Sequence, residues 1–393
     1  MNHQVLLKSI CLKNFLSYGP ESKPVELSPL NIVIGPNGSG KSNLIEAVEL
    51  IRSAPKDLLT PVREGGGIRD WLWKGGASIP TPTATLDAVF NNPKSSAKLR
   101  YLLSFTEVAQ RFEIVDERIE NEKPDTGHKA PYLYYRYENG HGVLNVKGER
   151  RKLQHEDIDT TSSILAQRKD PDQYPEITHL GAAFSKIRLY REWTFGRYTP
   201  PRLPQKADMP NDYLEPDCRN LGLVLNRIGS DPMAKKRILK ALQALYEGID
   251  DYYVQVEGGT VQVFFHEGRS SIPATRLSDG TLRYLCLLAI LCHPSPPPLI
   301  CIEEPELGLH PDVLPVLADL LKEASERTQL IVTTHSDVLV DAMTDQPESV
   351  LVAEKNGDGT TLTRLDSKQL MPWLEKYRLG QLWTRGDIGG TRW

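Results

Sequence analysis

Hydrophobic and polar residues alternate along several short segments in the first third of the chain. The alternation occurs in 5–12 and again in 84–90, 99–105 and 111–115, where charged residues, Pro and Asn separate the later segments. Successive side chains of a strand point to opposite faces of a sheet, so this period predicts strands that are buried on one face. We therefore predict antiparallel strands in this part of the chain.

The last third of the chain shows a different pattern, in which helical and extended segments take turns. Apolar residues at helical spacing, and short apolar runs between them, predict helix and strand in strict alternation over 280–292, 299–302, 311–325, 329–333, 336–343 and 349–354. This order is typical of a mainly parallel sheet with crossover helices.

The middle of the chain separates these two patterns. Dense and mixed charge over 116–175 predicts an exposed insertion, and 221–247 has the apolar spacing of two helices. Two alternating runs, 252–257 and 260–266, flank a pair of glycines and predict a β-hairpin.

The composition is that of a globular protein. Of 393 residues, 39% are hydrophobic and 25% are charged, and the formal net charge is −4. This balance excludes a disordered tail and provides no whole-protein basic field of the kind that drives nonspecific nucleic-acid binding. The five cysteines form no CxxC pair, which argues against a zinc knuckle. The longest nearly unbroken apolar run, 285–292, is less than half of what spans a bilayer, so we expect a cytoplasmic protein without membrane spans.

A glycine-rich segment between an apolar run and an amphipathic pattern carries the clearest chemical signal. Residues 35–42 read Gly-Pro-Asn-Gly-Ser-Gly-Lys-Ser and match the P-loop pattern G-x-x-x-x-G-K-S in full. The glycines let backbone N–H groups converge on phosphates at a helix N-terminus, while Lys41 reaches the β- and γ-phosphates and Ser42 ligates Mg²⁺. We therefore expect ATP and Mg²⁺ as cofactors. The predicted nucleotide-binding residues here are Gly35, Asn37, Gly38, Gly40, Lys41, Ser42 and Asn43.

Two later strand ends carry side chains suited to hydrolysis. Glu303 and Glu304 follow one buried-strand pattern, and His335 follows the next. A carboxylate beside the Mg²⁺ of Ser42 can hold the ion, which is the role predicted for Glu303. A second carboxylate can orient or deprotonate the attacking water, which is the role predicted for Glu304. His335 is placed to sense the γ-phosphate, and with Glu304 and Lys41 it completes the predicted catalytic set.

The order of these motifs is similar to that of ABC-type ATPase heads. Residues 277–281 read Leu-Ser-Asp-Gly-Thr before an apolar helix, which matches the L-S-x-G signature of that family. There the signature binds the γ-phosphate of ATP held by the partner protomer, so the resemblance implies that Ser278 and Gly280 bind nucleotide in an ATP-sandwich homodimer or a higher oligomer. It also implies a glutamine that links the Mg²⁺ site to a helical lobe, for which Gln205 is the candidate. The signature departs from the transporter form L-S-G-G-Q, and Glu303 stands where Asp is commonest.

The resemblance implies a fold as well. We expect an α/β P-loop NTPase of ABC-ATPase type, with a mixed sheet and crossover helices, an antiparallel β subdomain and a helical lobe. The corresponding segments are an N-terminal ATPase lobe over 1–115, an insertion and helical lobe over 116–275, and a C-terminal ATPase lobe over 276–393 that carries the signature, the acidic pair and the histidine.

Within the family, the chain looks like the compact RecF-like and OLD-like members. Gly-Leu-His-Pro at 308–311 and Lys-Asn-Phe at 13–15 carry this similarity, and a heptad run that would build a long coiled coil is absent from the sequence. Acidic residues after Glu354 never form Asp-x-Asp, which argues against an in-chain nuclease domain of the OLD type. Phe15 either packs against adenine, as its place in related heads implies, or is an ordinary core aromatic.

Two functions stay open at this point. In the first, an ATP-dependent dimer acts as a switch for an effector protein in trans, as OLD-like ATPases of bacterial anti-phage defence do. In the second, the protein is a RecF-like DNA-binding clamp in DNA repair. A clear basic stripe is missing from the sequence, which favours the first function.

Overall fold

The computed structural model describes residues 5–75, 82–92, 97–138, 140–146, 149–153 and 158–390. The chain forms two compact units, each built from segments that are not contiguous in sequence. Unit 1 comprises Met1–Ile187, Leu351–Leu365 and Ile388–Trp393, and unit 2 comprises Arg188–Val350 and Asp366–Asp387.

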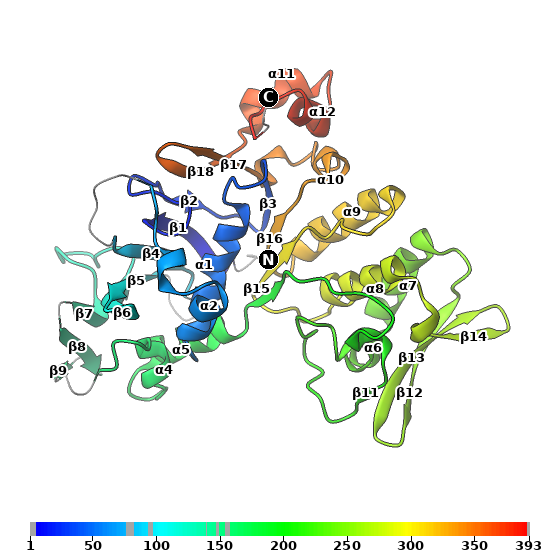
Figure 1. The fold of residues 1–393 in the computed structure, drawn as a ribbon, viewed down its shortest axis with the longest axis horizontal. Helices are drawn as coiled ribbons and strands as arrows, with labels where there is room; N and C mark the ends of the chain where they lie inside the picture. Colours follow the sequence, from blue (N-terminus) through cyan, green and yellow to red (C-terminus); the bar gives the residue numbers. More distant parts are fainter. Residues whose placement is uncertain are drawn as a thin grey trace. The chain divides into compact units, whose positions relative to one another are not determined.

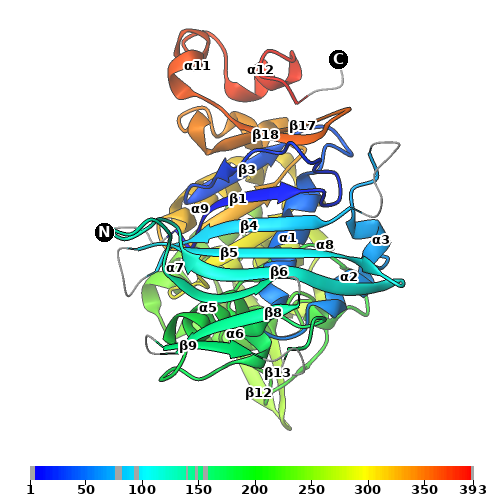
Figure 2. The same cartoon turned by 90° about the vertical axis from the view of Figure 1, so that its left-hand side faces the viewer.

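An eight-stranded antiparallel sheet dominates unit 1, and Figure 2 shows its strands β1, β4, β5 and β6 side by side. The strand order is β2-β1-β4-β5-β6-β7-β8-β9. Strands β1, β4, β5 and β6 confirm the antiparallel strands predicted from the alternation, and β4 buries every second residue. The bounds are β1 Leu7–Lys13, β2 Val25–Glu26, β4 Ala84–Phe90, β5 Leu99–Val108, β6 Arg111–Asn121, β7 Leu133–Glu138, β8 His141–Val146 and β9 Glu149–Leu153.

The predicted exposed insertion over 116–175 is wrong for much of its length. Strand β6 continues to Asn121, and β7, β8 and β9 extend the same sheet. Tyr135 and Tyr137 of β7 are buried on one face, together with Leu144 of β8, and the charged Arg136 and Glu138 alternate with the tyrosines, so charge hid the period of two in β7. The expected boundary at residue 115 therefore falls inside β6, and the two units of the structure differ from the three consecutive segments expected from the sequence.

The remainder of unit 1 surrounds a strand that is buried on both faces. All five residues of β3, Leu30–Ile34, are buried, and this strand neighbours β17, Val350–Asn356, which forms a hairpin with β18, Gly359–Arg364. Helix α1, Lys41–Ser53, follows β3 and packs against α2 and α5. The helices are α2 Leu59–Glu64, α3 Ile68–Trp71, α4 Ile164–Gln167 and α5 Pro175–Ser185.

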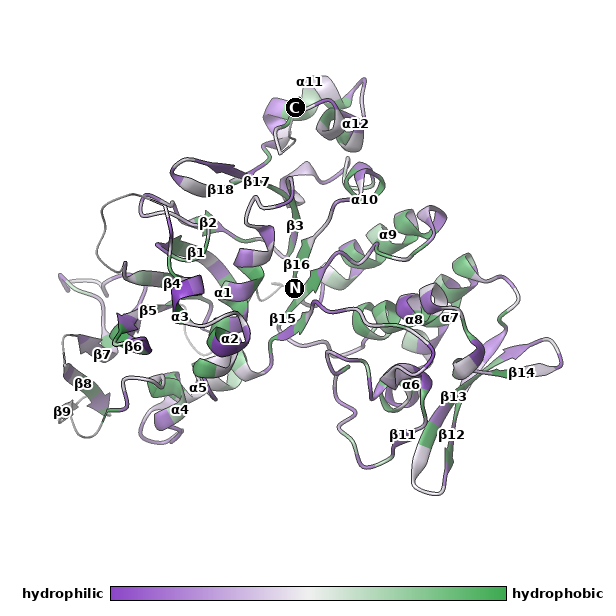
Figure 3. Cartoon of the chain, viewed as in Figure 1, coloured by the Kyte–Doolittle hydropathy of each residue, from purple (hydrophilic) through white to green (hydrophobic). Residues whose placement is uncertain are grey.

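Unit 2 contains the parallel strands and crossover helices expected for the last third of the chain (Figure 1). Strands β10, β15 and β16 pair in parallel. Figure 3 shows the hydrophobic colour along β16, in keeping with a strand whose residues are all buried. The bounds are β10 Arg188–Tyr190, α8 Asp279–Leu291, β15 Leu299–Glu303, α9 Leu314–Ser325, β16 Gln329–Thr333 and α10 Asp337–Asp341.

A lobe within unit 2 precedes these strands in sequence. The two predicted helices are confirmed as α6, Leu221–Gly229, and α7, Pro232–Leu245, and the predicted hairpin as β12, Asp251–Glu257, and β13, Thr260–Glu267. The sequence reading missed the short strands β11, Gln205–Lys206, and β14, Ser270–Pro273, and the helices α11, Ser367–Leu374, and α12, Leu379–Thr384. Within the described residues, no helix has the length and apolar character needed to cross a membrane.

Candidate active site

The P-loop of unit 1 requires glycine at defined positions. Gly40 has φ 97°, and a Cβ there would lie 2.3 Å from Thr360 Oγ1. A Cβ on Gly35 would lie 2.3 Å from the Ala353 carbonyl oxygen. Strands β17 and β18 therefore lie so close to the loop that only glycine fits at positions 35 and 40, whereas Gly38 at φ 78° has open space around it. These contacts leave the outer side of the loop to a ligand.

Lysine 41 and the start of α1 make this loop suited to an anion. The Lys41 ammonium is 6% exposed and donates to the carbonyl oxygens of Gly35, at 2.7 Å, and Pro36, at 3.1 Å. Helix α1 begins without a side-chain cap, so its first N–H groups are directed at the loop, next to the exposed Ser42. A buried ammonium at the start of an uncapped helix provides positive charge and N–H donors at one point, so these residues fit a nucleotide phosphate.

Other predicted residues of the loop lie where a ligand can reach them. Asn37 and Gly38 are exposed, and Asn43 is partly buried. The Asn43 amide donates to Ser17 Oγ at 2.6 Å, which orients this side chain beside the loop.

A hydroxyl cluster supports the P-loop from behind, and the sequence reading missed it. Thr360 Oγ1 bonds to the Ser39 carbonyl oxygen at 2.8 Å and to Ser17 Oγ at 2.7 Å. The Tyr18 hydroxyl donates to the Gly40 carbonyl oxygen at 3.1 Å. Since Ser17 and Thr360 are 343 residues apart, no local motif could have indicated this contact.

In unit 2, the predicted acid and the predicted histidine lie together at adjacent strand ends. Glu304 follows β15, its N–H donates to the Thr333 carbonyl oxygen of β16 at 2.9 Å, and its Oε1 lies 3.6 Å from His335 Nε2. Both side chains are about one third exposed, at 37% and 36%. Glu304 adopts φ 45°, a conformation that side chains disfavour. The backbone is thus strained at the residue predicted to orient water.

Glu306 fixes the histidine segment and was also missed. Its Oε1 accepts from Thr334 Oγ1 at 2.7 Å and from the His335 N–H at 2.8 Å. The sequence therefore predicts that β15 and β16 end at this point. The carboxylate that joins the two strand ends is Glu306, two residues after Glu304.

Residues after β10 anchor the acidic end of β15. Arg191 Nε lies 3.4 Å from Glu303 Oε2, and the Trp193 indole N–H donates to the Glu303 carbonyl oxygen at 2.9 Å. Arg283 of α8 stacks over the Trp193 ring at 4.9 Å and donates to the Glu304 carbonyl oxygen at 2.9 Å. Burial lowers the pKa of the Arg283 guanidinium to about 10, which still leaves it charged at neutral pH. Both predicted carboxylates are therefore held through their backbones.

The signature segment opens α8 and contacts the same region of unit 2. Ser278 is the N-cap, with its Oγ accepting from the Thr281 N–H at 3.1 Å, and it is exposed. A Cβ on Gly280 would lie 2.8 Å from the Gly308 carbonyl oxygen. The buried Arg202 donates to Asp279 at 2.5 Å and so fixes the start of the helix.

Two residues singled out from the sequence have side chains that are packed inside the protein. Gln205 is 5% exposed, and its amide oxygen accepts from the Gly222 N–H at 2.7 Å, a contact that holds α6 within the lobe. Its role as a metal ligand stays a prediction. Phe15 is fully buried, with its ring centroid 5.6 Å from that of Trp71 and 6.2 Å from that of Phe105. No face of Phe15 is left for adenine, and it is the core aromatic that the sequence left as the alternative.

The P-loop, the signature helix and the paired strand ends are the parts of an ABC-type ATPase head. The chain belongs to the family described as "AAA domain, putative AbiEii toxin, Type IV TA system", whose match covers residues 30–341. This confirms an ABC-like ATPase, while the narrower RecF-like or OLD-like grouping stays a prediction.

Solved structures of SMC heads share the fold. An SMC head bound to the C-winged helix domain of ScpA is 15% identical, with a TM-score of 0.59 over 93% of this chain and 100% of that chain. A Pyrococcus furiosus Smc head with an extended coiled coil, bound to the C-terminal domain of ScpA, is 14% identical, with a TM-score of 0.57 over 94% of this chain and 99% of that chain. An Smc head with a coiled coil and joint from Pyrococcus yayanosii is 12% identical, with a TM-score of 0.53 over 94% of this chain and 99% of that chain.

One curated relative shows sequence similarity over a shorter stretch. The chromosome partition protein Smc of Desulfitobacterium hafniense (strain Y51) is 31% identical over 100 residues, which are 25% of this chain and 8% of that protein. The chain therefore spans only a small part of that relative's length.

Proposed function

We propose that the protein binds and hydrolyses ATP with Mg²⁺. The observation that carries this proposal is the P-loop, where Lys41 is buried against the loop and an uncapped helix begins at the same point. Ser42 and Glu303 are the residues that would hold Mg²⁺, and the ion shields phosphate charge when bound. Glu304 would orient or deprotonate the attacking water. His335, whose Nε2 lies 3.6 Å from Glu304 Oε1, would sense the γ-phosphate.

Two variants separate binding from hydrolysis. Glu304→Gln keeps the shape of the side chain but removes the base, so it should retain ATP binding and lose turnover by about a hundredfold or more. Lys41→Ala should weaken ATP binding itself. Equilibrium binding of a fluorescent ATP analogue and steady-state phosphate release measure the two effects. Wild-type turnover by Glu304→Gln would show that the role given to Glu304 is wrong.

We further propose that two ATP-bound heads form a sandwich homodimer that switches an effector protein in trans, in bacterial anti-phage defence. Ser278 is exposed at the start of α8 with its backbone fixed by Arg202 and Gly280, as expected for a surface that meets a partner's nucleotide. The family description, which names a putative AbiEii toxin and a type IV toxin–antitoxin system, supports the defence role. Copurification of the native protein with the products of neighbouring genes tests it, and recovery of the protein without any such product opposes it.

A DNA-binding clamp is the second candidate, and the similarity to a chromosome partition protein over 100 residues favours it. It predicts ATP-dependent binding of duplex DNA that weakens steeply as salt rises, because phosphate contacts release counterions. The effector switch predicts no such binding at physiological salt.

A further inference from the structure

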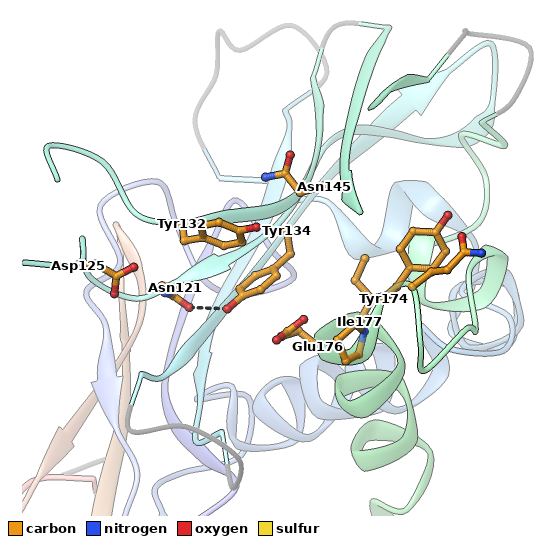
Figure 4. Close-up of a pocket in the computed structure, with 10 residues that line it drawn as sticks. Asn121, Asp125, Tyr132, Tyr134, Asn145, Tyr174, Glu176 and Ile177 are labelled. Carbon is orange, nitrogen blue, oxygen red and sulfur yellow. Dashed lines mark hydrogen bonds between the residues drawn. The ribbon is translucent and has the colours of Figure 1, made fainter. Parts of the chain in front are cut away.

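A cavity of about 370 Å³ lies in unit 1, on strands β6 to β8 and the start of α5 (Figure 4). The volume is near the lower end of the range of ligand pockets, which suits a single side chain. No residue assigned to nucleotide chemistry lines it. Its lining consists of Asn121, Asp125, Tyr132, Tyr134, Asn145, Gln173, Tyr174, Pro175, Glu176 and Ile177.

Aromatic rings form part of the wall and are held in place. The Tyr132 and Tyr134 rings pack edge to face with centroids 5.0 Å apart, and the Tyr134 hydroxyl donates to Asn121 Oδ1 at 3.0 Å. Asn121 is only 5% exposed, so this acceptor is fixed, whereas the Tyr132 ring is 40% exposed and can be reached from outside. In Figure 4, Tyr174 lies across the cavity from these rings.

The charge of the pocket has one sign. Asp125 and Glu176 contribute carboxylates, and the described residues that line the pocket include no Lys, Arg or His. Figure 4 shows the Glu176 carboxylate of α5 between Tyr134 and Ile177. Burial, and then the charge of Glu176, raise the pKa of Tyr134 to about 12, so the phenol stays neutral and keeps its donor at physiological pH.

We propose that this pocket binds the guanidinium group of an arginine side chain on a partner protein. A guanidinium is planar, so it can stack on the exposed Tyr132 ring while it donates to the Glu176 carboxylate. An anion would meet two carboxylates, and an apolar group would desolvate Glu176 without a partner. A lysine ammonium supplies the charge but neither the planar stacking nor the paired donors. This inference does not depend on ATP hydrolysis.

Capped amino acids test the chemistry directly on the full chain. N-acetyl-arginine amide should bind weakly, with a Kd on the order of 1 mM as befits one side chain, in ligand-observed NMR or calorimetry. N-acetyl-citrulline amide has nearly the same shape without the charge and should bind at least about tenfold more weakly, because it lacks the ion pair and the cation–π contact. N-acetyl-lysine amide should fall between them.

Variants place the binding in this pocket. Glu176→Gln and Tyr132→Ala should each weaken the arginine probe by about fivefold or more, as loss of a charge-assisted hydrogen bond or a cation–π contact requires. The matched control is Asp172→Asn, an exposed carboxylate just before α5 that does not line the cavity, and it should leave binding unchanged. Unfolding midpoints establish that each variant is folded, and the exposure of Tyr132 makes its truncation safe for the fold.

Three results would overturn the proposal. Equal binding of the arginine and citrulline probes would show that charge is not recognised, and equal binding by Glu176→Gln and wild type would place the probe elsewhere. Tighter binding of free arginine than of the capped amide would indicate a small-molecule site rather than a docking site for a partner protein.

Discussion

At the scale of single residues, Arg191 is the side chain whose role is least evident from motifs. It lies in the segment Tyr-Arg-Glu-Trp at 190–193, outside the P-loop, signature and acidic pair, yet its guanidinium is the counter-ion of Glu303 at 3.4 Å. Both side chains are largely buried, at 24% and 17% exposure, so the pair is shielded from solvent more than a surface ion pair. A cation that binds Glu303 must compete with Arg191.

We therefore predict that Arg191→Ala lowers the Mg²⁺ concentration needed for half-maximal ATP binding. The expected change is roughly two- to fivefold, which corresponds to an ion pair worth about 0.5–1 kcal/mol. Arg191→Lys keeps the charge and should resemble the wild type. Calorimetric titration of ATP at a series of Mg²⁺ concentrations, in a Glu304→Gln background that prevents turnover, gives the measurement. A higher Mg²⁺ requirement in Arg191→Ala would mean that Arg191 assists the ion rather than competing with it.

At the scale of elements, helix α8 joins the signature to the acidic strand end within unit 2. Its first turn touches Gly308 through Gly280, and Arg283, one turn further on, bonds to the Glu304 carbonyl oxygen. A displacement of the signature is therefore carried to the backbone of Glu304 by a single rigid helix.

Gly280→Ala tests this connection. The added Cβ would lie 2.8 Å from a backbone oxygen, so α8 or the 308 loop must shift, and overpacking of this kind costs about 1–3 kcal/mol. We expect reduced ATP turnover with P-loop nucleotide affinity retained. Gly357→Ala is the matched control, because nothing lies within 4 Å of its Cβ. Wild-type turnover in Gly280→Ala would show that the contact with Gly308 does not affect hydrolysis.

A buried carboxyl links β6 to α4 in unit 1 and makes stability depend on pH. Glu117 is buried, and its oxygens accept from Tyr101, from Ser163 at 2.5 Å and from the Ile164 N–H at 2.9 Å. Burial nonetheless raises the pKa of Glu117 from 4.5 to about 7. The folded state then holds this proton more tightly than the unfolded chain, so the contribution of Glu117 to stability is largest below about pH 4.5 and is lost as pH rises to about 7.

The expected size of this effect is about 3 kcal/mol, because each tenfold gain in proton affinity on folding is worth about 1.4 kcal/mol. Glu117→Gln removes the titration, so the difference in unfolding free energy between wild type and variant should change by that order between pH 4.5 and pH 8. Urea unfolding at several pH values measures it, and Glu113→Gln on the same strand controls for loss of an acid. Parallel pH profiles for wild type and Glu117→Gln would contradict the prediction.

At the scale of the whole molecule, contiguous motifs are visible in the sequence and long-range contacts are not. The P-loop and the strand ends at Glu304 and His335 were predictable, because a buried strand followed by a polar residue is visible in a short window. The Ser17–Thr360 contact and the return of 351–365 to unit 1 were not, since they join distant parts of the chain. Strand β7 was missed because Arg136 and Glu138, which alternate with the buried Tyr135 and Tyr137, made the segment look like a charged loop.

The assembly proposed above gives a prediction at the same scale. Glu304→Gln should be monomeric without nucleotide and dimeric with saturating ATP, because each signature has a nucleotide to bind only when the partner's P-loop is filled. Ser278→Arg places a bulky cation at that contact and should prevent dimerisation and hydrolysis while sparing ATP binding by one protomer. Light scattering after size exclusion measures the mass. An unchanged mass for Glu304→Gln with ATP would remove the support for ATP-driven assembly.

The left-handed conformation of Glu304 has a consequence for attempts to engineer this protein. At φ 45° a glycine or asparagine would relieve strain, so a search guided by melting temperature alone would favour replacing Glu304. Such variants should unfold at higher temperature than the wild type and fail to turn over ATP. A library screened for thermal tolerance would therefore enrich inactive proteins at this position, and position 304 should be kept fixed in any stabilisation campaign.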